Sequence, residues 1–267
     1  MTRLITDWIA DIEETIKDRE RDLKSKTGLT YAALAAKVSG CSVNDIDRAS
    51  QEIKVAVVPV TTGLGIIGSF AQSVAAIAGV MGFRSFVTEH TDVNGLCEAY
   101  QNGADIVYMA DDDRFICINL NKKKIADNDY ATALGYTTAM EGALGSFVGK
   151  EILLLGCGTL GREFMKCLKK KGASFAVFDI DSVKLNETRK EGISIIESPE
   201  EIAGYKYLID ATSQGDWLQR NMLHPEVWIA APGIPLSLDK DAYEVFMGQI
   251  IHDPLQIGAA SMLGLTL

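Results

Sequence analysis

The stretch EILLLGCGTLG, residues 151–161, decides the fold of this chain. Its apolar run predicts a strand buried on both faces, and its glycines follow in the spacing G-x-G-x-x-G. Gly156 would turn the chain sharply, Gly158 would let a pyrophosphate approach the backbone, and Gly161 would let the next helix pack against the strand. The free N–H groups at the start of that helix favour an anion. We therefore expect a dinucleotide at this turn.

The residues downstream favour NAD over NADP. Asp179 ends the next apolar strand, about 20 residues beyond the glycines, where a carboxylate accepts hydrogen bonds from ribose hydroxyls. Ile180 and Asp181 follow, so no Arg stands there to bind a 2′-phosphate. A Rossmann-like fold that has lost its cofactor is the structural alternative. Further cofactor contacts are expected at the helix start and at the ends of two later strands: Thr159, Leu160, Ala211, Thr212 and Pro232.

The same glycine spacing occurs earlier, as GLGIIG at residues 63–68, with Glu89 at a tolerable distance after it. Residues 59–62 separate this motif from the apolar core of its strand, so the turn is longer and richer in hydroxyls. We assign the dinucleotide to the later turn, because only there are strand, turn, helix and acid in register. Thr61 and Thr62 instead offer hydroxyls to a substrate.

Strands alternate with helices on both sides of a long helix expected at residues 131–147, which predicts two α/β halves with parallel sheets. Residues 1–140 would form the substrate-binding and catalytic domain, extended by an amphipathic helix over residues 4–26. Residues 141–267 would form a Rossmann-like, doubly wound parallel sheet that binds NAD. A final apolar helix at residues 256–265 would pack back across the domain junction.

Two polar stretches carry no visible chemistry. Residues 42–47 are expected to form a link after a helix at residues 31–38. The lysines at 122–124 are the one basic cluster of note, and we interpret them as a solvated turn. Because this cluster is short and the formal net charge is −10, a nucleic-acid partner is not expected.

The 267 residues are 47% hydrophobic and 23% charged, which is typical of a globular protein. The five cysteines contain no Cys-x-x-Cys pair and the three histidines are scattered, so we expect reduced thiols and no metal site. The first residues include acids rather than the apolar run of a signal peptide, which suggests a cytoplasmic protein. No apolar stretch reaches the length of a membrane span, so no membrane partner is expected.

Carboxylates, rather than a histidine or lysine base, are the titratable groups that stand at the expected strand ends. Asp111, Asp112 and Asp113 directly follow a strand expected at residues 105–109. An Asp at that place has better than average odds of facing a cleft, where it would bind a cationic amine. Asp253, just before the final helix, is a second candidate. A solvated loop is the alternative for each.

Four stretches together resemble the pyrrolysine synthase family, the dehydrogenases of the last step of pyrrolysine biosynthesis. The match is collinear from Leu23 onward, and the spacing of the glycine motif, the Asp cluster and the final helix is distinctive. The stretches are VVPVTTGLGIIGSF (57–70), MADDDRF (109–115), APGIP (231–235) and DPLQIGAASML (253–263).

The resemblance implies two domains, an active site in the cleft between them, and NAD as the oxidant. The family's substrate is 3-methyl-D-ornithine joined by an amide to the ε-nitrogen of L-lysine. Its terminal amine would be oxidised to an imine and hydrolysed to an aldehyde with loss of ammonia. The α-amine of the methylornithine part would then close on the aldehyde to form the pyrroline ring. Hydrolysis and closure need water and geometry, which agrees with the absence of an obvious base.

By the same resemblance, Asp111 is the catalytic carboxylate and binds the substrate amine. The residues implied to bind substrate are Thr61, Thr62, Leu64, Asp111, Asn119, Asn128 and Asp253. Two of them depart from the family pattern, since Leu64 stands where Asn is expected and Asp253 where Glu is expected. An Asp reaches one methylene less far than a Glu, although it carries the same charge.

Two other functions stay open. One is a different NAD(P)-dependent dehydrogenase, of the shikimate or methylene-tetrahydrofolate type, although no Lys stands beside residues 61–68 to act as its acid or base. The other is a non-catalytic module that senses a dinucleotide. A small cationic molecule is the expected partner, and the oligomeric state stays open, with a homodimer as one option.

Overall fold

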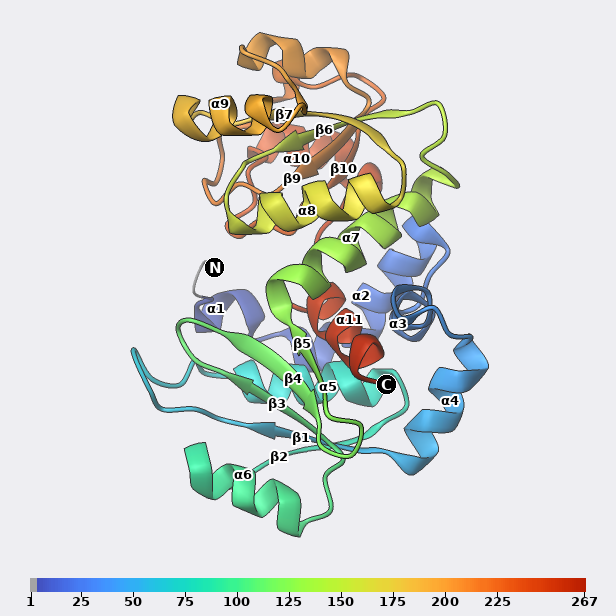
Figure 1. Cartoon of the computed structure of the whole chain (residues 1–267), viewed down its shortest axis with the longest axis vertical. Coiled ribbons are helices and arrows are strands. Elements are labelled where there is room, and N and C mark those ends of the chain that lie inside the picture. The colour runs from blue at the N-terminus through green and yellow to red at the C-terminus, as the bar shows by residue number, and fades with distance from the viewer. Residues whose placement is uncertain (1–3) are drawn as a thin grey trace.

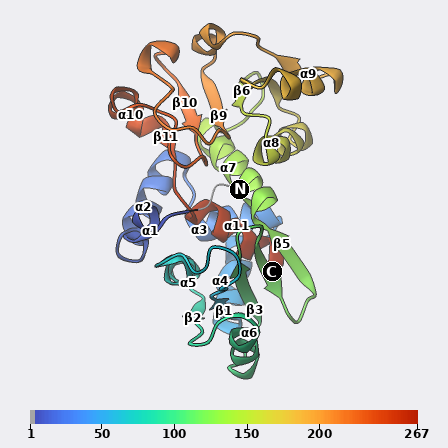
Figure 2. The same ribbon diagram turned by 90° about the vertical axis from the view of Figure 1, so that its left-hand side faces the viewer.

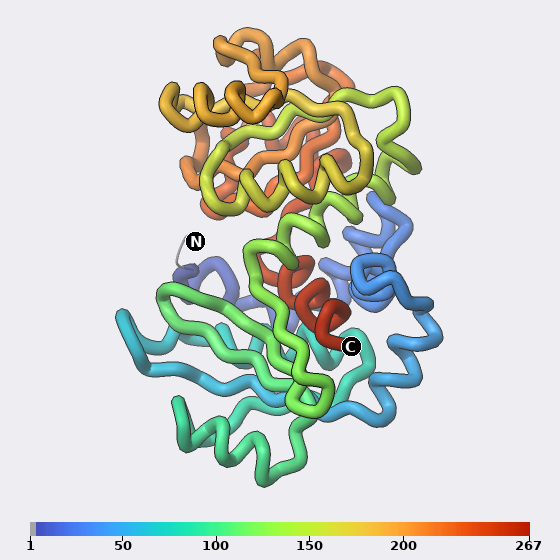
Figure 3. Tube along the Cα trace, viewed as in Figure 1, coloured from blue at the N-terminus to red at the C-terminus, as the bar shows by residue number. Residues whose placement is uncertain are grey.

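The computed structural model describes residues 4–267 and arranges them around two sheets joined by the long helix α7 (Asn128–Leu144) (Figures 1 and 3). In Figure 1 the first sheet lies at the bottom, the second at the top, and α7 runs between them. Residue 140, at which the sequence divides into two halves, lies within α7. The two halves are therefore connected by a continuous helix rather than by a loop.

The first sheet has five strands in the order β2-β1-β3-β4-β5. β1 pairs in parallel with β2 and β3, whereas β4 pairs antiparallel with β3 and β5. The alternation of strands and helices predicted only parallel strands here, which is wrong for β4 and β5. The meander leaves no signal in the sequence, because residues 115–118 are all apolar, and fully and partly buried residues alternate in β4 only once the chain is folded. The strands are β1 (Lys54–Val58), β2 (Arg84–Val87), β3 (Ile106–Ala110), β4 (Phe115–Asn119) and β5 (Lys124–Asp127).

The second sheet has six parallel strands in the order β11-β10-β9-β6-β7-β8. Continuous apolar strands form it because helices or loops cover both of its faces. This arrangement confirms the predicted fold class, a Rossmann-like parallel sheet joined to a second α/β unit. The strands are β6 (Glu151–Leu155), β7 (Ser174–Phe178), β8 (Ser194–Ile195), β9 (Tyr207–Asp210), β10 (Trp228–Ala230) and β11 (Ile250–Ile251).

Helices surround both sheets. The long helix expected at residues 131–147 is α7, which begins and ends three residues earlier, and two further predictions differ from the structure. The expected helix over residues 4–26 is two helices, α1 and α2, and Gly28 in the left-handed conformation ends the second. The polar link expected at residues 42–47 is wrong, because Ser42 and Asp45 form a capping box and the helix α4 begins at Val43. The helices outside α7 and the last helix are α1 (Thr6–Ile9), α2 (Ile12–Thr27), α3 (Tyr31–Ser39), α4 (Val43–Glu52), α5 (Phe70–Val80), α6 (Asp92–Gln101), α8 (Thr159–Lys170), α9 (Ser182–Lys190) and α10 (Lys240–Phe246), with 3₁₀ turns η1 (Pro199–Gly204), η2 (Arg220–Met222) and η3 (Met247–Gln249).

The last helix, α11 (Gln256–Thr266), returns to the first half of the molecule. It packs against α3 and α7 and lies over the first sheet, as the two perpendicular views show (Figures 1 and 2). Its small residues allow close approach, since a Cβ on Gly264 would lie 2.6 Å from the carbonyl oxygen of Ala35. The buried Tyr108 hydroxyl donates to the carbonyl oxygen of Ala259 at 2.7 Å. Almost every residue of α11 is buried, so this helix completes the core of the first half.

Among residues 4–267, no helix combines the length and the apolar character that a membrane span requires. In the same range, no group of three or more His, Cys, Asp and Glu side chains is placed to hold a metal ion.

Candidate active site

A cavity of about 420 Å³ lies where the two halves face each other. The carboxyl ends of β1, β3, β9 and β10 reach its wall, as expected for the ligand site of a parallel sheet. The first half, together with α7, α11 and the segment just before α11, contributes Leu4 and residues 58–60, 65–67, 70, 71, 110–112, 115, 128, 129, 132, 136, 253–255 and 258. The second half contributes residues 158–160, 211–213 and 232–234. Residues far apart in sequence thus meet around one volume.

The glycine turn of the second half has the geometry that a pyrophosphate requires. Gly156 adopts φ 98°, a left-handed conformation that leaves β6 at once for α8. A Cβ on Gly158 would meet no atom within 4 Å, so the backbone there is open to the cavity. A Cβ on Gly161 would overlap the carbonyl oxygen of Gly156, so only glycine lets the helix sit this close to the strand.

The other residues predicted to bind cofactor lie on both sides of this turn. Thr159 and Leu160 line the cavity in the first turn of α8. Ala211, Thr212 and Pro232 line it at the ends of β9 and β10. The structure therefore brings these residues together around one side of the cavity.

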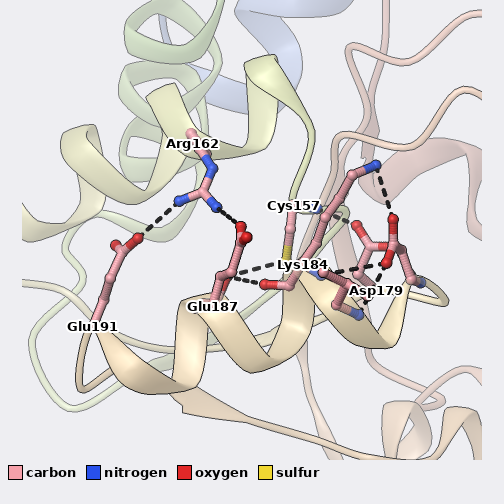
Figure 4. Close-up of polar contacts among 9 residues, drawn as sticks. Cys157, Arg162, Asp179, Lys184, Glu187 and Glu191 are labelled. Carbon is pink, nitrogen blue, oxygen red and sulfur yellow. Dashed lines mark hydrogen bonds and ion pairs between the residues drawn. The ribbon is translucent and has the colours of Figure 1, made fainter.

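Asp179 lies behind the glycine turn, at the end of β7, and does not line the cavity. Its Oδ2 accepts a hydrogen bond from the Cys157 N–H at 2.6 Å, and its Oδ1 accepts one from the Asp181 N–H at 2.8 Å (Figure 4). Each carboxylate oxygen has a second lone pair, which would be available to a ribose hydroxyl. Asp179 therefore both fixes the turn and fits the ribose end of a dinucleotide.

The cations near Asp179 are engaged by other acids. Arg162 contacts Glu191 at 2.9 Å and Glu187 at 3.1 Å, and Lys184 lies 3.5 Å from Asp181 (Figure 4). A 2′-phosphate at this place would therefore meet Asp179 and Asp181 before any guanidinium. Each of these two cations near the end of β7 is thus already engaged by an acid.

Asp111 and Asp112 line the opposite side of the cavity, in the turn between β3 and β4. One oxygen of Asp111 accepts hydrogen bonds from the N–H groups of Asp113 and Arg114 at 2.9 and 2.8 Å, which fixes its orientation. Asp112 accepts a hydrogen bond from the Leu64 N–H at 2.6 Å and so joins this turn to the first glycine turn. Asp113 does not line the cavity.

The first glycine turn differs from its sequence interpretation. Thr61, Thr62 and Leu64 do not line the cavity, and the Leu64 side chain is 77% exposed. The Thr61 N–H and hydroxyl donate to Asp92 at 2.8 and 2.7 Å, and these bonds lower the pKa of that carboxyl. The wall is formed instead by residues 65–67, which follow the glycine at position 63. The Thr61 hydroxyl therefore holds the loop, and neither threonine lines the cavity.

Asn119 also lies away from the cavity, although the resemblance implies that it binds substrate. It is 2% exposed, and its Nδ2 donates to the carbonyl oxygen of Thr266 at 3.0 Å. Its Oδ1 accepts hydrogen bonds from the N–H groups of Asn121 and Lys122 at 3.1 and 2.8 Å. Asn119 therefore anchors α11 to the β4–β5 turn. Asn128, by contrast, lines the cavity at the start of α7.

Asp253 lines the cavity at the approach to α11 and is 7% exposed. Burial raises the pKa of its carboxyl to about 6, although hydrogen bonds from the N–H groups of Ile257 and Leu255 favour the charged form. The buried Tyr136 hydroxyl donates to the Asp253 carbonyl oxygen at 2.8 Å and accepts from its N–H at 2.9 Å. This carboxyl is therefore rigidly placed, and burial brings its pKa closer to neutrality than that of an ordinary aspartate.

Sequence reasoning missed Asp129, which lines the cavity beside Asn128. Burial raises the pKa of this carboxyl, and Asp127 and Glu163 act in the same direction. Its signal was its position in the first turn of a long helix, where an acid is common for local reasons. The cavity wall thus carries four carboxylates (Asp111, Asp112, Asp129 and Asp253), and none of its described residues is Lys, Arg or His.

Solved structures of low sequence identity share this fold. Shikimate 5-dehydrogenase from Thermus thermophilus, solved with NADP(H) and shikimate, matches with a TM-score of 0.52 and 13% identity, over 79% of this chain and 91% of that one. A 5,10-methylenetetrahydrofolate dehydrogenase from the silkworm Bombyx mori matches with a TM-score of 0.51 and 14% identity, over 88% and 93%. The fold is therefore that of the Rossmann-type dehydrogenases, with the cavity between the two α/β halves.

The sequence matches are more specific. Residues 9–126 match the family model of the pyrrolysine biosynthesis protein PylD, N-terminal domain. Pyrrolysine synthase from Methanosarcina barkeri is 32% identical over 264 residues, 98% of this chain and 97% of that protein. The enzyme of the same name from Methanosarcina acetivorans is 37% identical over 211 residues, 79% and 81%. The chain belongs to the pyrrolysine synthase family, which confirms the resemblance seen in the sequence.

Proposed function

We propose that this protein is an NAD-dependent dehydrogenase that oxidises the terminal amine of L-lysine carrying (3R)-3-methyl-D-ornithine on its ε-nitrogen, so that pyrrolysine is formed. One observation carries the proposal. A single cavity is bounded on one side by a glycine turn suited to a dinucleotide and on the other by carboxylates without a basic neighbour in its described wall. Such a wall favours a ligand with several ammonium groups over an anion.

The carboxylates account for how the substrate would be held. Asp111 and Asp112 would bind the terminal ammonium group, because they are fixed by backbone hydrogen bonds and face the cavity. The glycine turn, Thr212 and Asp179 would hold NAD, which accepts a hydride when it is bound.

The reaction also needs a proton acceptor, because the ammonium nitrogen must lose one proton before its carbon gives up a hydride. Asp253 would take this proton on its carboxylate, which its pKa of about 6 permits near neutral pH. Water would then add to the resulting imine carbon and ammonia would leave. The α-amine would attack the aldehyde, and loss of water would close the ring. Those later steps need enclosure and orientation from the wall rather than a further base.

The test is to incubate the purified protein with NAD and the synthetic lysine–methylornithine amide. We expect NADH absorbance to rise and the product to be lighter than the substrate by one ammonia and two hydrogens. Asp111→Asn should lower kcat/KM by about 100-fold, because it removes the charge that holds the ammonium. Its affinity for NAD should stay unchanged, since Asp111 lies across the cavity from the glycine turn.

Two outcomes would contradict the proposal in different ways. Turnover of a hydroxy acid or a folate with the amide left inert would favour the shikimate or methylene-tetrahydrofolate type of dehydrogenase. Those enzymes are expected to carry a Lys at the substrate loop, and the described cavity wall contains none. NAD binding without turnover of any of these compounds would favour a dinucleotide sensor.

A further inference from the structure

A buried carboxylate at the end of β9 has no role in the reaction outlined above. Asp210 is 0% exposed, and burial raises the pKa of its carboxyl. Its Oδ1 accepts hydrogen bonds from the Thr212 N–H at 3.0 Å and the Thr212 hydroxyl at 2.6 Å. Its Oδ2 accepts a hydrogen bond from the hydroxyl of Ser237, which is also fully buried. The structure gives it no ion pair with a described Lys, Arg or His.

These three bonds join two loops that both reach the cavity. Thr212 belongs to the loop after β9, and Ser237 belongs to the loop after β10. The same loops are joined by backbone hydrogen bonds, from the Leu218 N–H to the Ser237 carbonyl at 2.8 Å and from the Asp216 N–H to the Leu236 carbonyl at 3.2 Å. The loops also touch at the cavity, because a Cβ on Gly233 would overlap the carbonyl oxygen of Thr212.

The sheet itself does not require a carboxylate at this place. Burying one is costly unless donors compensate it, and neighbouring strands end in the apolar residues Leu155 and Ala230. Among the described residues, the hydrogen-bond partners of the Asp210 carboxylate lie on the two cavity loops. The buried carboxylate of Asp210 therefore fixes the geometry of the two loops and does not contribute to the pairing of the strands.

We propose that Asp210 is a positioning residue for the dinucleotide, which holds Thr212 and the loop of Gly233 and Ser237 in one fixed arrangement at the cavity wall. This inference rests on the proposed function, because it assumes that the second half binds NAD. Asp210 acts through Thr212 and Ser237 and does not line the cavity itself. Without Asp210, the backbone hydrogen bonds at Leu218 and Asp216 would still join the loops, but nothing would fix the Thr212 hydroxyl and the Ser237 hydroxyl relative to each other.

Binding measurements separate this role from general stability. Calorimetry with NAD should show that Asp210→Ala weakens affinity by about tenfold, the effect expected for losing buried bonds to a carboxylate. Asp210→Asn should stay within about threefold of the wild type, because its amide oxygen accepts from Thr212 and its NH₂ group donates to the Ser237 oxygen. Ser237→Ala removes only the hydrogen bond from the Ser237 hydroxyl to Asp210 and should weaken NAD affinity by about threefold.

A matched control and an optical signal complete the experiment. Ile202→Ala creates a cavity in the core of the same half and removes none of the hydrogen bonds of Asp210, Thr212 and Ser237, so it should lower Tm and leave NAD affinity unchanged. The Trp217 indole N–H donates to the Thr212 hydroxyl at 3.4 Å. Tryptophan emission should therefore change in Asp210→Ala without NAD present, and should not change in Ile202→Ala.

Two results would overturn the inference while leaving the proposed function intact. One is wild-type NAD affinity in a folded Asp210→Ala or Ser237→Ala protein. The other is an Asp210→Asn variant as weak as Asp210→Ala, which would assign the effect to charge rather than to geometry. Failure of the wild-type protein to bind NAD at all would overturn the proposed function together with this inference.

Discussion

The two glycine turns share one sequence pattern and differ in structure. In the second half, Gly156 directly follows β6 and α8 begins at Thr159, so the three glycines form one tight turn. In the first half, several residues separate the end of β1 from Gly63, and α5 begins only at Phe70. The glycines there make room for a carboxylate and for the helix α1. The comparison teaches that the spacing of glycines has meaning only relative to the strand and helix around it.

The largest expected difference in stability and NAD affinity is between substitutions of the third glycine in the two turns. Gly161→Ala would place a Cβ on the Gly156 carbonyl oxygen, where backbone must move, so we expect a loss of about 3 kcal/mol of stability and at least about 100-fold in NAD affinity. Gly68→Ala is the matched control, because its Cβ would lie 2.9 Å from the Thr6 hydroxyl oxygen, at the end of a side chain that can rotate. Chemical denaturation and calorimetry would measure both. Equal effects of the two changes would contradict the comparison.

The next effect concerns Asp253, in a wall of the cavity that belongs to neither turn. Its folded-state pKa of about 6 lies above the ordinary value of 3.8, so its stabilising contribution is full at low pH and is lost as the pH rises through 6. Asp253→Asn cannot ionise. We expect the stability of the variant relative to wild type to increase by about 3 kcal/mol between pH 4 and pH 7. Urea denaturation across this range would measure the difference, and a constant difference would rule out the raised pKa.

A smaller effect, on the KM for the amide substrate, is expected to differ between substitutions of the first two glycines of the earlier turn. Both Gly63 and Gly65 have positive φ, of 75° and 81°, so an Ala at either place pays a similar backbone cost of about 1 kcal/mol. Only Gly63→Ala would also overlap the Asp112 carboxylate. We expect it to raise the KM for the amide substrate by about tenfold relative to Gly65→Ala, without changing the affinity for NAD. Identical KM values would show that Asp112 does not position the substrate.

The smallest expected effect is on dinucleotide affinity, when the acid that follows each glycine turn is replaced. Asp179→Ala removes a ribose partner and should weaken NAD binding by about fivefold, with a smaller change for NADP. Glu89→Ala, at the corresponding distance from the first turn, should change neither affinity. Titration of both dinucleotides would test this, and sensitivity to Glu89→Ala would place a dinucleotide at the wrong turn.

The second half could be predicted from sequence because its signals are local. A strand of consecutive apolar residues, a glycine turn and the acid at the end of the next strand lie within one short segment of the chain. The first half could be predicted only in outline. Thr61 has the composition of a substrate-binding residue, but its hydroxyl bonds to Asp92, and nothing local identifies that partner.

Asn119 illustrates the same limit of local patterns. The sequence of β4, Phe115 to Asn119, is apolar up to its last residue and shows no alternation, and the Nδ2 of Asn119 donates to the carbonyl of Thr266, far away in the chain. Asp129 was missed for the opposite reason, because an acid in the first turn of a helix has an ordinary explanation. Contacts between distant segments decide which polar residues face the cavity, and such contacts leave no periodic pattern.

The return of α11 to the first half has a consequence for biosynthesis. The strands of the first sheet are complete once Asp127 has been made, but the helix that covers them begins at Gln256. At about 5–20 residues per second, the ribosome needs on the order of ten seconds to make the intervening chain. During that interval the apolar surfaces of α3, α7 and the first sheet that α11 covers in the folded protein are exposed. We expect the nascent chain to depend on chaperones during this interval, because the first half can complete its core only after α11 has been synthesised.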